Sequence, residues 1–227
     1  MKSMVGIGGV ILIGLAFCGC AAQTIPTDTS GMVLKTGWTR TEQPVRSWKY
    51  LRDQNVVIQR YDYSCGSGAL ATLMRYYFGD HVGEEEILIS ILNTMSYDEV
   101  LDREKYGLSL LDLKRYAEQR GYQAFAVRLN YANLLLLKGP VLIHLEREEY
   151  RHFAVLKGVR GDRVYLADPS RGNIRMSVNR FAQEWAGVAL IMGRKDFGLP
   201  GNDSLGLGDR DPVQNEMLNA RRSLFKR

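Results

Sequence analysis

The sequence has little cysteine, little histidine and only one long apolar run, and each shortage excludes a class of protein. Only 3 of the 227 residues are cysteine and 3 are histidine. Cys18 and Cys20 lie near the N-terminus, and the three histidines and Cys65 are widely spaced and give no zinc-binding pattern, so we expect neither a metal nor another cofactor. The one apolar run lies at the N-terminus, which excludes a multi-span membrane protein. The net charge of +5 is spread along the chain, so it does not indicate a nucleic-acid-binding protein.

Composition and length indicate one globular domain with appendages. Hydrophobic residues make up 45% of the chain and charged residues 24%, which excludes wholesale disorder, collagen and coiled coil. The length fits one domain of roughly 100–200 residues. From shifts in composition we expect an export signal over residues 1–22, a polar linker over 23–47, a folded domain over 48–196 and a flexible, basic tail over 197–227.

The N-terminus has the layout of a secretory signal. Lys2 is followed by an uncharged run over residues 5–17 and then by small residues, which predicts export to the periplasm. Gly19-Cys20 resembles the end of a lipobox, and lipidation of Cys20 would anchor the protein to a membrane. The alternatives are signal-peptidase cleavage near Ala22, which would leave a soluble periplasmic protein, and retention of the run as an uncleaved anchor.

Helical periodicity fills the first half of the expected domain and strand patterns fill the second. Helices are expected over residues 65–78, 84–95 and 109–121. Strands are expected over residues 122–128, 140–145, 153–159, 163–167 and 188–192. The Arg160-Gly161-Asp162 turn between two of these runs predicts a hairpin. Helices followed by antiparallel strands predict an α+β fold.

Cys65 is the only cysteine of the expected mature chain, because Cys18 and Cys20 belong to the signal. A single thiol cannot form an internal disulfide, so it is either an inert core residue or a reactive group. Cys65 stands at the predicted start of a helix, between small residues. The unpaired N–H groups and the positive dipole at a helix start favour a thiolate. The inert interpretation stays open on this pattern alone.

His152 begins the first strand of the predicted hairpin, and Asp168 ends the second strand. Antiparallel pairing of these strands would place both residues near the same end of the sheet. An imidazole there could take the thiol proton as a general base. Asp168 could accept the second imidazole N–H and so orient the ring. The simpler alternatives are a surface histidine and an Asp-Pro turn. His144 is a weaker candidate for the base, and His81, in a glycine-containing loop, is expected to be structural.

Gln59 lies six residues before Cys65. Its side-chain amide could donate a hydrogen bond to the oxyanion that forms when a thiolate attacks a carbonyl. A glutamine before a cysteine is weak support by itself. The order Gln59, Cys65, His152 and Asp168, each in a suitable local context, is strong support for attack of a thiolate on a carbonyl.

The same residues resemble a known family. Residues 59–66, Gln-Arg-Tyr-Asp-Tyr-Ser-Cys-Gly, are similar to the cysteine box of the C39 peptidases, a papain-like group. Residues 139–144, residues 152–155 and the Asp168-Pro169 pair are similar to the rest of the family pattern. The resemblance covers residues 56–192.

This resemblance implies a fold and a set of roles. It implies a papain-like fold over residues 48–196, with N-terminal helices packed on a C-terminal antiparallel sheet. It also implies Cys65 as nucleophile, His152 as base, Asp168 as orienting residue and Gln59 in the oxyanion hole.

The resemblance further implies a polypeptide substrate. C39 peptidases usually remove leader peptides after a Gly-Gly pair, as a domain of an ABC exporter. This sequence has no transmembrane domain and no Gly-rich ATP-binding loop. A free-standing, exported chain of this kind is similar to the accessory protease of bacterial functional-amyloid secretion systems. Its implied partners are amyloid subunits, their outer-membrane pore, or both.

We therefore expect a periplasmic cysteine endopeptidase that cleaves an exported polypeptide. One alternative is a catalytically idle C39-like module that binds an extended peptide or leader. Another is a cell-wall hydrolase or transglutaminase-like enzyme, which shares the Cys-His chemistry.

Overall fold

The structure is a computed structural model that describes residues 29–36, 39–147, 150–195, 197–198 and 204–207. The expected export signal with Cys20, and the basic residues near the C-terminus, lie outside these ranges. The helices and strands follow one another as β1 (Thr29–Thr36), β2 (Thr39–Arg46), α1 (Trp48–Asp53), α2 (Cys65–Tyr76), α3 (Glu84–Leu92), α4 (Tyr97–Tyr106), α5 (Leu110–Gln119), β3 (Tyr122–Arg128), α6 (Tyr131–Leu135), β4 (Val141–Arg147), β5 (Tyr150–Arg160), β6 (Arg163–Asp168), β7 (Gly172–Ser177), α7 (Val178–Glu184) and β8 (Trp185–Arg194).

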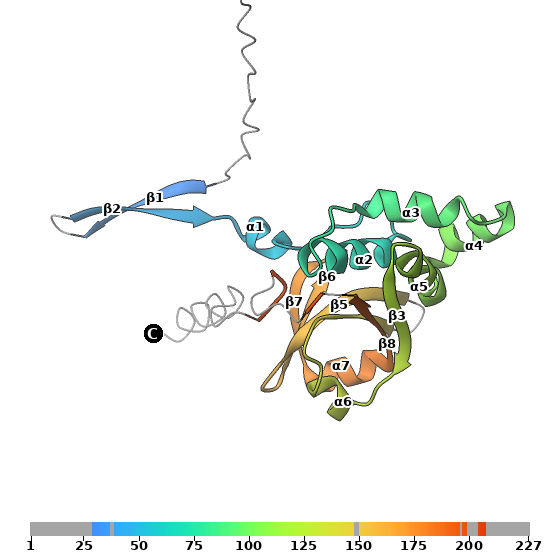
Figure 1. The fold of residues 1–227 in the computed structure, drawn as a ribbon. Helices are drawn as coiled ribbons and strands as arrows, with labels where there is room; N and C mark the ends of the chain where they lie inside the picture. Colours follow the sequence, from blue (N-terminus) through green and yellow to red (C-terminus); the bar gives the residue numbers. More distant parts are fainter. Residues whose placement is uncertain (1–28, 37–38, 148–149, 196, 199–203, 208–227) are drawn as a thin grey trace, which may run out of the picture.

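A six-stranded antiparallel sheet forms the C-terminal half of the domain. Its strand order is β3-β8-β4-β5-β6-β7. Helices α2, α3 and α5 pack on one side of the sheet, and α6 and α7 lie on the other (Figure 1). Each side has its own buried apolar cluster, one around Leu70 and Val155 and one around Phe181 and Ile143. The predicted α+β fold, with helices packed on an antiparallel sheet, is confirmed.

Helix α2 is the most deeply buried helix and it carries Cys65 at its first position. All ten residues from Cys65 to Met74 are buried. Gly68 lets its first turn approach the chain that follows β6, because a Cβ at this position would lie only 2.9 Å from the Cβ of Pro169. The start of α2 is therefore held directly against the end of β6.

The predicted boundaries of helices and strands agree with the structure where the sequence carries a local start or stop signal. Ser109 caps α5 and forms a capping box with Asp112, which fixes the start of that helix. Gly121 follows α5 with φ of 84°, and β3 begins directly after it. The β5–β6 hairpin turns at Gly161, where φ is 58°. A positive φ is least costly for glycine, so these turns could be expected from sequence.

Several elements were missed by the sequence patterns. Helix α4 has no buried residues, so it lacks the apolar periodicity by which a helix is predicted; a capping box of Ser96 and Glu99 starts it instead. The expected helix over residues 84–95 ends at Leu92, and α4 follows soon after it. Helices α1, α6 and α7 are too short to show a period, and the sheet-edge strand β7 was also missed.

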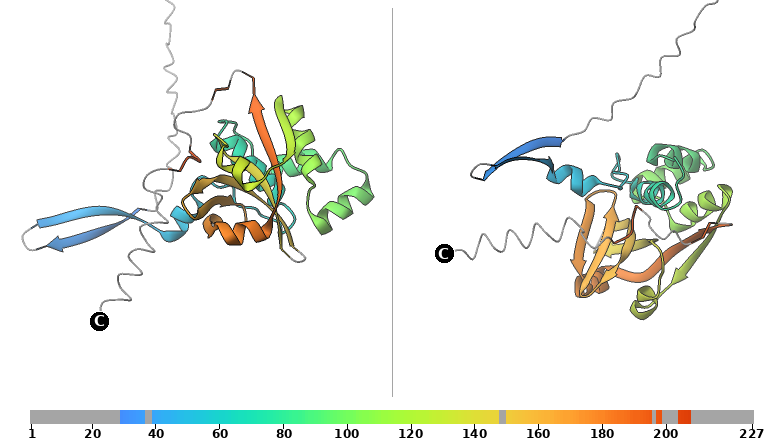
Figure 2. Two further views of the ribbon diagram at one scale, coloured as in Figure 1. Left: turned by 90° about the horizontal axis from the view of Figure 1, so that it is seen from below. Right: turned by 60° about the vertical axis from the view of Figure 1, so that its left-hand side comes forward.

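The stretch expected to be a linker, residues 23–47, contains a β-hairpin. Strands β1 and β2 pair antiparallel, with Thr29 opposite Arg46 and Thr36 opposite Thr39. The hairpin extends away from the rest of the domain in all three views (Figures 1 and 2). Threonine and valine recur in both strands, and this β-branched content favours strands over the open linker that we expected.

The expected flexible tail also contributes to the domain. Leu205 is only 1% exposed and belongs to the apolar cluster around Leu70. The Asn55 side chain donates a hydrogen bond to the carbonyl of Ser204 at 2.8 Å. The described residues 204–207 therefore pack on the domain rather than forming a free tail. No helix in the described ranges is both long and apolar enough to cross a bilayer.

Candidate active site

Cys65 lies where the sequence places it, at the first position of α2. Its side chain is buried, with 5% of the residue exposed, and it is hydrogen-bonded to the imidazole of His152. The first N–H groups of an α-helix have no partner within the helix. The thiol thus stands next to backbone donors and beside an imidazole, which is the environment of a reactive cysteine.

His152 and Asp168 meet across the β5–β6 hairpin. The Nε2 atom of His152 lies 2.9 Å from Oδ1 of Asp168, and the two residues are 2% and 0% exposed. The expectation that the hairpin brings them to the same end of the sheet is confirmed. Because Asp168 engages Nε2, Nδ1 is the ring nitrogen left for the thiol of Cys65. The three side chains form one buried, hydrogen-bonded series.

The Asp168 carboxylate is held by the turn that follows it. Oδ1 accepts hydrogen bonds from the backbone N–H of Ser170, from its hydroxyl and from the N–H of Arg171, at 2.9, 2.9 and 3.1 Å. Oδ2 pairs with the guanidinium of Arg171, at 2.8 Å to Nε and 2.6 Å to Nη2. Asp168 therefore opens a turn and also contacts the ring of His152.

The charge states follow from these contacts. Burial lowers the pKa of His152, because a charged ring loses hydration. Hydrogen bonds to Asp168 and Cys65, together with their charges, outweigh burial and raise the pKa of His152 to about 9. Burial acts to raise the pKa of Asp168, but His152, Arg171 and Ser170 hold that pKa well below its ordinary value. At neutral pH the site contains an imidazolium and a carboxylate.

Gln59 lies in the loop over residues 59–64 that leads into α2. Its backbone N–H donates to the carbonyl of Pro169 at 2.8 Å, which ties it to the residue after Asp168. Its side-chain Nε2 donates to the carbonyl of Tyr61 at 2.8 Å and has a longer contact of 3.4 Å with that of Asp62. Its Oε1 is buried and has no hydrogen-bond partner among the described residues. These contacts hold the Gln59 amide against the backbone of its own loop, with both donated contacts going to carbonyls of that loop rather than to Cys65.

The other two histidines stand apart from this series. His144 is half-buried, lies against the ring of Phe153 at 4.8 Å between centroids, and has Nδ1 3.4 Å from Glu146. Burial lowers the pKa of His144, so this ring is neutral at neutral pH. His81 is exposed in the loop before α3. Among the described residues, no group of three or more histidine, cysteine or acidic side chains is arranged to hold a metal ion.

Sequence reasoning missed the residues that support the site. Arg171 lies three residues after Asp168, and an arginine at this spacing from an aspartate is too common in sequences to indicate a site. Glu84 is buried, with 4% exposed, and contacts the 59–64 loop. In the sequence it belongs to the acidic run over residues 84–86, which is explained equally well by the dipole of α3. Only its burial separates it from its neighbours.

The chain is similar to known proteins. Residues 53–196 match the peptidase C39 family. The chain is 33% identical over 169 residues to the "Probable functional amyloid protease FapD" of Pseudomonas aeruginosa, covering 74% of each chain. It is 38% identical over 148 residues to the protein of that name from Pseudomonas fluorescens, covering 65% of this chain and 64% of the relative.

A solved structure supports the fold. A double glycine motif protease from an AMS/PCAT transporter, crystallised in complex with the leader peptide, superposes with a TM-score of 0.51 at 25% identity. The superposition covers 62% of this chain and 94% of that one.

Proposed function

Because the chain belongs to the peptidase C39 family, we propose that it is a cysteine endopeptidase that cleaves an exported polypeptide in the periplasm. One observation carries the proposal: the thiol of Cys65, the imidazole of His152 and the carboxylate of Asp168 form one buried hydrogen-bonded series at the start of α2. A thiol paired with a base, and a base paired with an orienting acid, is the arrangement needed for nucleophilic catalysis.

The proposed reaction is acyl transfer through a thioester. In the reactive form the proton of Cys65 already resides on the His152 imidazolium, and the thiolate attacks the scissile carbonyl carbon. The C–N bond of the resulting tetrahedral intermediate then breaks, and the imidazolium gives its proton to the leaving amine. Water, deprotonated by the now neutral imidazole, attacks the thioester; the C–S bond breaks, the carboxylic acid product leaves, and the thiolate and imidazolium are restored. Asp168 stays ionised throughout and keeps the ring in place.

The oxyanion of the intermediate requires donors beside the sulfur. The backbone N–H of Cys65, at the first position of α2, supplies one. The Gln59 amide supplies the second. Its Nε2 carries two protons, and the contact with Asp62 at 3.4 Å is long compared with the 2.8 Å contact with Tyr61. The weakly held proton is the one available to a substrate oxygen.

The proposed substrate is a component of a functional-amyloid system. This part of the proposal rests on the two relatives named as probable functional amyloid proteases. Amyloid subunits and their outer-membrane pore are the candidate polypeptides, because both would pass through the compartment to which the N-terminal pattern directs this chain. An anchor at Cys20, if lipidated, would hold the peptidase at a membrane surface during that passage.

Comparative mapping of protein N-termini tests the function. Periplasmic and secreted proteins are compared from cells that express the native chain or its Cys65→Ala variant. We expect a small set of new N-termini that require Cys65 and disappear equally in His152→Ala. The matched control is His81→Gln, which changes an exposed histidine and should leave the set intact.

The same experiment separates the alternatives. If the N-termini are the same with Cys65→Ala and the secretion pathway still works, the chain is a binding module rather than a peptidase. Release of muropeptides from purified sacculi by the native chain, lost in Cys65→Ala, would indicate a cell-wall hydrolase instead.

A further inference from the structure

Glu84 is a buried carboxylate that the proposed reaction does not use. It is the first residue of α3 and is only 4% exposed. Glutamate is rarely buried without a specific partner, because removing an ionised carboxylate from water is costly. The partners of Glu84 therefore indicate why it is placed there.

Both described partners of Glu84 belong to the 59–64 loop. Its Oε1 accepts a hydrogen bond from the backbone N–H of Arg60 at 3.0 Å and from the hydroxyl of Ser64 at 2.5 Å. The Ser64 oxygen in turn accepts the N–H of Tyr61 at 3.1 Å. One carboxylate oxygen thus joins the two ends of the turn over residues 60–64 and fixes its shape.

The residues next to the ends of that turn are those assigned to the chemistry. Gln59 directly precedes Arg60, and Cys65 directly follows Ser64. The side-chain amide of Gln59 is oriented by the Tyr61 carbonyl, which lies within the same turn. A change in the turn would therefore move the Gln59 amide relative to the Cys65 sulfur.

We propose that Glu84 is a positioning residue for the oxyanion site, acting through the 59–64 loop. This inference rests on the proposed function. Donors to an oxyanion are effective because they are held in place before the reaction. A misplacement of about 1 Å can cost roughly 100-fold in rate. Glu84 supplies this restraint from a different helix, so the distance between the amide and the sulfur does not depend on the loop alone.

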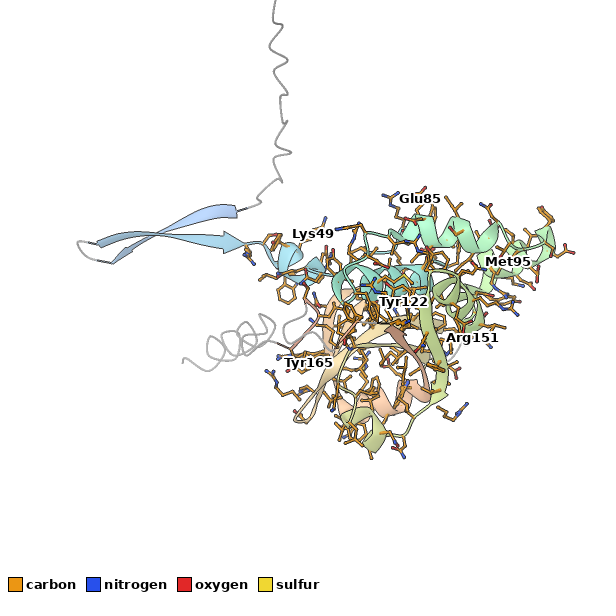
Figure 3. The ribbon with its side chains drawn as sticks, in the orientation of Figure 1. Lys49, Glu85, Met95, Tyr122, Arg151 and Tyr165 are labelled. Carbon is orange, nitrogen blue, oxygen red and sulfur yellow. The ribbon has the colours of Figure 1, made fainter. Side chains whose placement is uncertain are left out.

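The neighbouring acidic residue provides a matched control. Glu85 pairs with the side chain of Arg60 at 2.9 Å, but the two side chains are 53% and 68% exposed, and exposed ion pairs contribute little. Glu85 lies on the outer surface of α3 (Figure 3). Glu85→Gln removes the same charge from the same helical turn as Glu84→Gln, without loosening the backbone of the loop.

Two small reagents separate positioning from simple stability. p-Nitrophenyl acetate acylates Cys65 through a tetrahedral oxyanion, releasing p-nitrophenolate. Iodoacetamide alkylates the same sulfur by displacing iodide, with no oxyanion formed. Rates with both reagents are measured for the full chain, for Glu84→Gln and for Glu85→Gln. Glu84→Gln leaves a neutral oxygen that accepts both hydrogen bonds more weakly than a carboxylate does. They are also measured for Ser64→Ala, which removes the hydroxyl that donates to Glu84. Cys65→Ala supplies the blank.

For Glu84→Gln and Ser64→Ala we expect acylation to slow by about 10- to 100-fold, while alkylation stays within roughly 3-fold of the native rate. Glu85→Gln should match the native chain in both reactions. Circular dichroism and thermal unfolding establish whether each variant is folded. If Glu84→Gln does not fold, Ser64→Ala still tests the inference.

The inference is overturned if folded Glu84→Gln and Ser64→Ala acylate at the native rate, or if acylation and alkylation fall together. Absence of any Cys65-dependent acylation in the native chain would overturn the proposed function and this inference with it. The first two outcomes leave the proposed function standing, so the two failures are distinguishable.

Discussion

Asp168 determines the charge state of His152 at the candidate site. Its carboxylate lies 2.9 Å from the imidazole and is itself held by Ser170 and the guanidinium of Arg171. These contacts keep the carboxylate ionised, which in turn keeps the ring protonated. In the proposed reaction, the pair would supply both a proton for the leaving group and a fixed orientation for the ring.

Replacing Asp168 with asparagine should show this effect. Asn keeps an acceptor for the ring but removes the charge, so the pKa of His152 should fall from about 9 toward its ordinary 6.5. In the pH profile of the peptide-cleavage rate, we expect the fall at high pH (the high-pH limb) to occur about 1–2 pH units lower in Asp168→Asn. The measurement uses a peptide that spans a cleavage site mapped in cells. The control Arg171→Lys keeps a cation beside Asp168, and its high-pH limb should stay at the native position. If the high-pH limb of Asp168→Asn does not move, Asp168 does not set the pKa of His152.

The same titrations predict how stability depends on pH. The pKa of His152 is raised on folding, so its contribution is complete below about 6.5 and is lost as pH rises through about 9. The pKa of Asp168 is lowered on folding, so its contribution is present above the ordinary value of 3.8 and is lost as pH falls below it. The alkaline loss is on the order of 3 kcal/mol.

Urea unfolding from about pH 6 to about pH 10 checks this prediction. His152→Gln removes the titrating ring and should flatten the alkaline fall, whatever its own stability. An equally steep fall in His152→Gln would assign the pH dependence to other groups.

Between elements, α2, which begins at Cys65, packs directly against the residue that follows Asp168 at the end of β6. Gly68 makes this contact possible, because a Cβ there would lie 2.9 Å from Cβ of Pro169 and 3.3 Å from the carbonyl of Val57. The backbone of the first turn of α2 therefore packs directly against the side chain of Pro169, and there is no room for a methyl group between them.

Gly68→Ala should therefore destabilise the protein, although alanine favours a helix by about 1 kcal/mol over glycine. Overpacking of this kind costs about 1–3 kcal/mol. Gly66→Ala is the matched control, because its Cβ would meet only side-chain atoms of Leu113 and Phe153, at 3.2 and 3.3 Å, and these can shift. Urea unfolding of both variants measures the difference; a Gly68→Ala chain as stable as the native one would show that α2 can move.

At the scale of the whole molecule, residues 204–207 complete the core on the side of the sheet that α2, α3 and α5 cover. Leu205 is buried there, Asn55 binds the carbonyl of Ser204, and Arg160 binds the carbonyl of Leu207 at 2.9 Å. The segment thereby joins the start of the domain to the β5–β6 hairpin.

Leu205→Ala should lower the free energy of unfolding by about 2–4 kcal/mol, because it leaves a cavity in a packed core. Leu207→Ala is the control: Leu207 is half-buried beside Gly158, and we expect a loss below about 1 kcal/mol. Urea unfolding of the full chain tests both. Equal effects from the two substitutions would contradict a specific role for Leu205.

The sequence by itself was sufficient for features that depend on near neighbours. The start of α5 follows from a capping box within four residues, and the β5–β6 hairpin from a glycine turn. The meeting of His152 with Asp168 also follows, because a tight hairpin fixes which residues lie at the same end. The α+β class follows from the order of these local patterns.

Tertiary structure alone decided the contacts between segments far apart in the chain. Glu84 could not be distinguished from Glu85 until the packing of α3 against the 59–64 loop buried one and exposed the other. Leu205 lies in a stretch rich in glycine and aspartate, and it is buried in an apolar cluster whose members extend from Val56 to Leu190. Periodicity and capping report only neighbours within a few turns, whereas burial depends on which surfaces the completed fold brings together.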